Sequence, residues 1–84
     1  MAKILEDLIA ERESLTDEQL HALYLKHKES PYIENPLSEE RFRPAYRRLL
    51  DTEIAAWEAL EAQNWGLHDK LDRESDALCR RLGF

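Results

Sequence analysis

Valine is absent from this 84-residue chain, and other β-branched residues are scarce. Those present are Ile4, Ile9, Thr16, Ile33, Thr52 and Ile54. Because β-branched residues favour strands, the chain has little from which to build a sheet. Glycine and proline are also few, while 43% of the residues are apolar and 36% are charged. This balance is typical of a globular helical protein, so we predict a single all-α domain over residues 1–84, a small bundle of three to four helices.

Cysteine is limited to Cys79, which excludes an internal disulfide framework and suits a reducing cytoplasm. The adjacent Arg80 and Arg81 could lower the pKa of this thiol, but no histidine lies near it in sequence, so we interpret it as structural. With only Gly66 and Gly83 available, the chain has no glycine-rich phosphate loop. We therefore predict a protein that is not an enzyme and that holds no cofactor.

Long apolar runs are missing as well. The N-terminus opens Met-Ala-Lys and then mixes apolar with acidic residues, so it lacks the apolar core of a signal peptide. No run approaches the roughly 18 apolar residues that a membrane span needs. We expect a soluble, cytoplasmic protein that contacts no membrane, of the small kind found in bacterial, plasmid or phage genomes.

The net charge of −6 is distributed unevenly. Residues 1–40 contain ten Asp and Glu against four Lys and Arg, whereas residues 41–84 contain eight of each sign. An acidic front half disfavours nucleic acid and favours a protein partner with a basic patch. Glu11, Glu13 and Asp17 are the acidic residues that we expect to meet such a patch.

A seven-residue recurrence runs through the second half of the chain. Its members are Leu50, Trp57, Asn64, Leu71 and Leu78. This spacing keeps one helix face turned toward a partner, which is either the rest of the bundle or, in a homodimer, the same face of a second copy. Asn64 is interpreted either as the polar residue that sets the register of that pairing or as the last residue before a helix end capped by Gly66.

The expected helices cover residues 2–13, 17–29, 44–64 and 67–82, with a loop over 30–43. Thr16 and Gln19 have the spacing of a capping box, and Leu15 with Leu20 forms the matching hydrophobic staple. Pro44 removes one helical hydrogen bond, which favours a new helix with Pro44 in its first turn. The alternative is one kinked helix that continues through Pro44. A break at Gly66 is slightly favoured over an unbroken helix.

Arginines gather between Arg41 and Arg48. Arg43 and Arg47 lie one helical turn apart and could grip a phosphate or a partner's carboxylates. Pairing with acidic residues inside the molecule is the favoured alternative. Two aromatic residues outside the apolar stripes, Tyr32 and Trp65, are predicted interface contacts, since aromatics supply much of the energy at interfaces.

These features predict a small acidic protein–protein interaction module, such as an inhibitor, adaptor or assembly factor. One alternative is a nucleic-acid-associated regulator that uses Arg41–Arg48. A second alternative is a metal or small-molecule site at Glu18 and His21, because an E-x-x-H pair places both side chains on one helical face.

Overall fold

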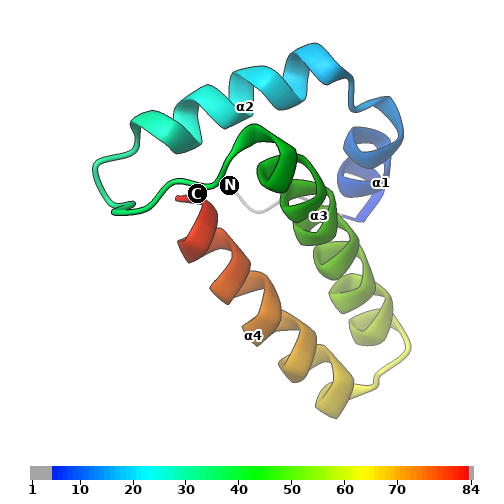
Figure 1. Cartoon of the computed structure of the whole chain (residues 1–84). Helices are drawn as coiled ribbons and strands as arrows, with labels where there is room; N and C mark the ends of the chain where they lie inside the picture. Colours follow the sequence, from blue (N-terminus) through cyan, green and yellow to red (C-terminus); the bar gives the residue numbers. More distant parts are fainter. Residues whose placement is uncertain (1–4, 84) are drawn as a thin grey trace.

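The computed structural model describes residues 5–83 and contains four helices in that range. They are α1 (Leu5–Ser14), α2 (Asp17–Glu29), α3 (Glu39–Glu61) and α4 (Trp65–Leu82). The two long helices, α3 and α4, pack side by side in antiparallel directions, α1 lies against α3, and α2 runs across one end of the pair (Figure 1). No strand occurs among the described residues, so the all-α bundle is confirmed. The predicted start of the first helix at residue 2 lies outside them.

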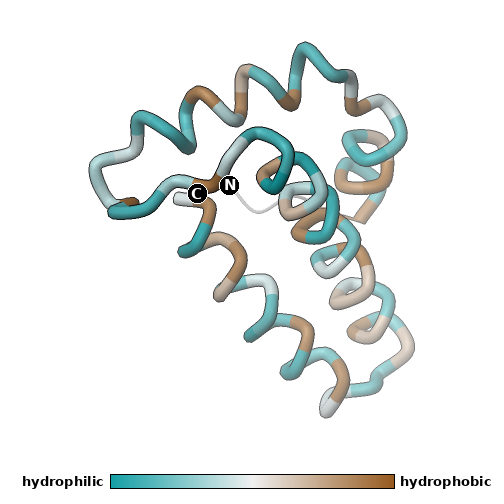
Figure 2. The backbone as a smooth tube through the Cα atoms, viewed as in Figure 1, coloured by the Kyte–Doolittle hydropathy of each residue, from teal (hydrophilic) through white to brown (hydrophobic). Residues whose placement is uncertain are grey.

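One apolar core joins all four helices. Its buried members are Leu8, Leu20, Phe42, Tyr46, Leu49, Leu50 and Leu82. Apolar and polar stretches alternate along every helix, as expected when each helix buries only one side (Figure 2). In residues 5–83 no helix is both long and apolar enough to cross a membrane.

The start of α2 follows the predicted capping box. The Gln19 amide donates to the Thr16 hydroxyl at 3.2 Å, and the Thr16 amide donates to the Gln19 side-chain oxygen at 3.0 Å. Leu20 is fully buried and Leu15 packs against the core beside it. The local sequence therefore fixes this boundary, because two orphan amides are satisfied without any help from the rest of the fold.

Helix α3 begins at Glu39, five residues before the predicted start, and continues through Pro44. The Glu40 carbonyl that loses its partner to Pro44 belongs to an exposed residue, so water can replace the missing bond. Continuity also places Phe42 one turn from Tyr46, with the ring centroids 6.0 Å apart and both side chains buried. Burial of these two rings outweighs one lost hydrogen bond, and the alternative of a helix continuing through Pro44 is the correct one.

The chain reverses between α3 and α4 at residues 62–64 instead of at Gly66. Gln63 takes the left-handed conformation, with φ of 58°, that usually favours glycine. Its amide donates to the Leu60 carbonyl, and the Asn64 amide donates to the Ala59 carbonyl, both at 3.0 Å or less. These two bonds form a Schellman motif that ends α3. Gly66 lies in the first turn of α4, where its missing side chain leaves open space.

This reversal divides the seven-residue recurrence between two antiparallel helices. Leu50 and Trp57 belong to α3, whereas Leu71 and Leu78 belong to α4. Asn64 caps α4 through a side-chain oxygen that accepts the Leu67 amide. The predicted face for a homodimer is therefore divided between two helices, and its member Leu50 is buried in the core. The homodimer itself stays a prediction.

A single histidine ties three segments together near the end of the chain. His27 on α2 is buried, and its Nδ1 donates to the Leu82 carbonyl at 3.1 Å. The Leu37 amide donates to Nε2 of the same ring at 2.8 Å. In this arrangement Nε2 is the acceptor and Nδ1 the donor. Gly83, with φ of 80°, follows at once and lies against Ile33 of the loop.

Candidate functional site

A groove of about 780 Å³ opens between the four helices; we call it the central groove. Its apolar walls include Leu8 of α1, Leu23 of α2, and Leu50, Trp57 and Leu60 of α3. Its polar lining comes from all four helices and consists of Glu11, Lys26, Tyr46, Glu53, His68, Asp72, Ser75 and Cys79. A space of this size, with apolar walls and a few polar groups, has the character of a binding pocket in a helical bundle.

Hydrogen bonds organise the polar side of the central groove. The Tyr46 hydroxyl donates to Glu11 at 2.8 Å. Burial raises the pKa of Tyr46, and the adjacent Glu11 carboxylate raises it further. On the facing helix, Ser75 donates to Glu53 at 3.5 Å and the Cys79 thiol lies 3.9 Å from the same oxygen. The carboxylates thus join α1 to α3 and α3 to α4.

The surroundings of Cys79 favour the thiol over the thiolate. Burial raises its pKa, and the negative charges of Glu53 and Asp76 add to the effect. A thiolate is the reactive form of cysteine, so this environment opposes nucleophilic chemistry. The hydrogen bond with Ser75 acts in the opposite direction but does not reverse the shift.

The predicted pair Glu18 and His21 does not act together. His21 donates through Nδ1 to Glu39 of α3 at 2.6 Å, and Glu18 is exposed. Within residues 5–83, no three His, Cys, Asp or Glu side chains are grouped so that they could hold a metal ion. The structure therefore gives His21 a contact between α2 and α3, and Glu18 takes no part in it.

Two of the predicted partner-binding residues bind each other. Arg43 donates to Asp17 of α2 at 3.3 Å and to Glu39 at 3.1 Å. The hydrogen bond from His21 is the main reason that the pKa of Glu39 lies below its ordinary value, and the charge on Arg43 acts in the same direction. Arg43 and Asp17 thus connect the starts of α2 and α3, as the internal-pairing alternative expects.

The other predicted contacts belong to different elements of the fold. Glu13 is exposed on α1, and Arg47 is half-buried on α3 without an ion pair to any described residue. Tyr32 is 90% exposed in the loop over 30–38, and Trp65 is 60% exposed at the start of α4. Because the Tyr32 loop packs near the end of α4, these aromatics lie near opposite ends of that helix. Each of these contacts stays a separate prediction.

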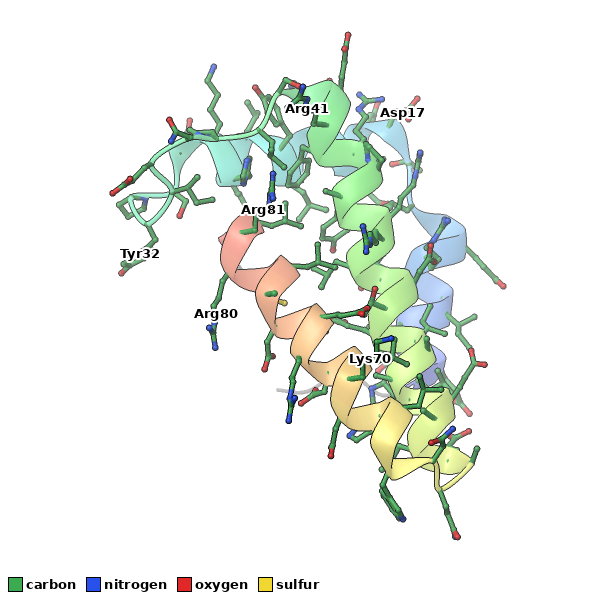
Figure 3. The ribbon with its side chains drawn as sticks, turned by 60° about the horizontal axis from the view of Figure 1, so that its bottom comes forward. Asp17, Tyr32, Arg41, Lys70, Arg80 and Arg81 are labelled. Carbon is green, nitrogen blue, oxygen red and sulfur yellow. The ribbon has the colours of Figure 1, made fainter. Side chains whose placement is uncertain are left out.

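A second, smaller hollow of about 360 Å³ lies between α3 and α4; we call it the arginine hollow. Arg41 and Arg48 of α3 and Arg81 of α4 line it. Its remaining lining is apolar and consists of Leu37, Pro44, Ala45 and Leu78. Arg80 and Arg81 leave α4 in different directions, and Arg81 is the one on the side of Arg41 (Figure 3).

Proximity along the chain groups the arginines between Arg41 and Arg48, and it leaves out Arg81. The seven-residue interval between Arg41 and Arg48 does predict that these two share one helix face. Arg43 lies on a different face of the same helix. No sequence signal shows that the end of α4 would bring Arg81 to that face. The groups around Glu53 are equally remote in sequence, being separated by 22 and 26 residues.

Comparison with known proteins assigns no family to the chain. No protein-family model, curated protein or solved structure matches it. The function of the central groove and the arginine hollow is therefore inferred from their own shape and charge.

Proposed function

We propose that the protein is a small, acidic, non-enzymatic protein–protein interaction module whose central groove receives a basic amphipathic segment of a partner. An inhibitor, adaptor or assembly factor would act in this way. The observation that carries the proposal is the combination, in one opening between four helices, of apolar walls with carboxylates.

The shape of the central groove suits side chains inserted by a partner. Leu23, Trp57 and Leu60 line it and are only half-buried, so apolar surface is left for a partner to cover. Amphipathic helices bind such grooves by inserting apolar residues that recur at three- and four-residue intervals. Each inserted side chain removes further apolar surface from water, which is the main source of affinity.

The charge of the central groove favours a basic segment. Glu11, Glu53 and Asp72 line it, against a single lysine, Lys26. The chain as a whole carries a net charge of −6. Complementary charge speeds the encounter of two proteins and sets their orientation. The attraction depends on the summed charge, so it persists although the oxygens of Glu11 and Glu53 accept internal hydrogen bonds.

The state of the reactive groups supports a binding role. Tyr46 and Cys79 line the groove, and the pKa of each is shifted in the direction that favours the protonated, uncharged form. A nucleophile or general base needs the opposite shift. These side chains instead hold α1, α3 and α4 in place around the opening.

The test is a binding titration with a basic amphipathic helical peptide, followed by the fluorescence of Trp57 in the Trp65→Phe protein. Trp57 lines the groove and Trp65 does not, so a blue shift reports occupancy of the groove. A peptide with the same apolar residues and acidic instead of basic positions is expected not to bind. Asp72→Lys should weaken binding of the basic peptide by about tenfold, because it inverts a charge at the opening.

The matched control is Asp69→Lys, which makes the same charge change on α4 at an exposed residue outside the groove. It should alter affinity by about twofold or less, through the change in net charge alone. The proposal fails if the basic peptide does not bind, if Trp57 fluorescence does not respond, or if both lysine variants weaken binding equally.

A further inference from the structure

We propose that the arginine hollow is a second binding site, which takes an acidic segment of a partner protein in which two carboxylates flank an apolar side chain. This inference goes beyond the proposed function and does not depend on it. It rests on the position, the charge and the lining of Arg41, Arg48 and Arg81.

The three guanidinium groups are gathered but not used inside the molecule. All three arginines are exposed, and none makes an ion pair or hydrogen bond through its side chain with a described residue. Arg12 and Arg43 differ, since each binds a carboxylate of another helix. In a chain with a net charge of −6, three unpaired positive charges around one hollow form a local site for anions.

The lining of the hollow selects a peptide over a nucleic acid. Guanidinium groups bind carboxylates through two parallel hydrogen bonds, and the floor offers Leu37, Pro44 and Leu78 to an apolar side chain. A single-stranded nucleic acid would need aromatic side chains for its bases, and none lines this hollow. The acidic remainder of the chain also repels a long polyanion.

The arginine hollow and the central groove lie on different sides of α3. Arg41, Ala45 and Arg48 recur at intervals of three and four residues and share one side, whereas Tyr46, Leu50 and Glu53 share another in the same way. One partner can therefore occupy each site without displacing the other. Since the two sites prefer opposite charges, a protein that uses both would connect a basic segment with an acidic one.

The test is fluorescence anisotropy at low salt with a labelled peptide that carries a Glu-Leu-Glu core. Arg81→Ala, and separately the double variant Arg41→Ala/Arg48→Ala, should weaken binding by about tenfold or more, as expected when charge-assisted bonds are lost. Replacing leucine by glutamine in the peptide should also weaken binding, because the apolar floor loses its contact. Arg80→Ala is the matched control, being an adjacent exposed arginine outside the hollow, and should change affinity by about twofold or less.

Several outcomes would overturn this proposal. The peptide could fail to bind, Arg80→Ala could weaken binding as much as Arg81→Ala, or an unrelated single-stranded oligonucleotide could bind more tightly with the same arginine dependence. The last result would identify a nucleic-acid site. Binding of the basic peptide at the central groove should be unchanged in the arginine variants, so failure of one site is distinguishable from failure of the other. Circular dichroism and unfolding midpoints confirm that each variant is folded.

Discussion

Helices α3 and α4 line both the central groove and the arginine hollow, yet the charged side chains of the two sites differ in their internal contacts. Glu11 and Glu53 of the groove accept hydrogen bonds from Tyr46 and Ser75, whereas the hollow arginines have no such partners among residues 5–83. A polar group near the core must be satisfied, because its desolvation otherwise costs more than folding gains. A charge at the surface carries no such requirement and can be left for a partner.

The largest expected effect comes from removing an apolar side chain from each site. Leu50→Ala should lower the free energy of unfolding by about 3 kcal/mol, because Leu50 is buried and its loss leaves a cavity. Leu78→Ala in the hollow should cost about 1 kcal/mol, since Leu78 is only half-buried. Urea unfolding followed by circular dichroism measures both. Equal losses would show that the hollow is as much a part of the core as the groove.

A second test removes one hydrogen-bond donor. Tyr46→Phe should lower the free energy of unfolding by about 1 kcal/mol, because Glu11 loses a donor in a half-buried position. Tyr32→Phe is the matched control and should have no measurable effect, since Tyr32 is 90% exposed. If both variants unfold like the parent protein, the Tyr46–Glu11 bond does not contribute to stability.

The third test concerns the reversal that brings α3 and α4 together around both sites. Gln63→Gly should stabilise the protein by up to about 1 kcal/mol. Glycine has no Cβ and therefore adopts the left-handed conformation without the steric cost that glutamine incurs there. Gly66→Ala should also stabilise, by about 0.5 kcal/mol, since a methyl group there meets nothing and favours helix. Thermal unfolding measures both changes. Loss of stability in Gly66→Ala would instead place the left-handed residue at Gly66.

The smallest expected effect tests, through pH, the contacts that Glu39 makes with His21 and Arg43. The hollow arginines have no carboxylate partner of this kind among residues 5–83. The pKa of Glu39 is lower in the folded protein than its ordinary value of 4.5, so Glu39 stabilises the fold above that value. This contribution is lost as pH falls through the lower, folded pKa. The stability of the parent protein and of Glu39→Gln should therefore converge below about pH 4.5 and differ slightly above it, the size being limited by solvent. A constant difference at all pH values would contradict this role.

Local sequence signals predict the start and end of α2 correctly. The Thr16 capping box places its first residue at Asp17. The predicted last residue, Glu29, stands just before Ser30 and Pro31, and a residue that precedes proline disfavours helix. Both signals act within a few residues, so no distant contact can overrule them easily. The all-α fold class is predicted for a similar reason. A chain with few strand-forming residues and many helix formers favours helices over a sheet.

Predictions fail where a distant contact decides between two local choices. Pro44 alone favours a new helix, but the buried rings of Phe42 and Tyr46 keep α3 continuous. Gly66 is the better residue for a left-handed cap, but the Schellman bonds form around Gln63. Packing energies are large compared with the preference of one proline or one glycine, so the position of the break follows the packing.

The same distinction between local signals and distant contacts applies to the candidate site. The sequence by itself determined an acidic, all-α chain with one basic cluster and the start of its second helix, because charge and capping depend on residues and their near neighbours. Only the tertiary structure decided that Arg43 binds Asp17, and that Arg81 joins Arg41 and Arg48. Those groupings join separate helices, and the packing of the helices, which no short stretch of sequence encodes, decides which side chains meet.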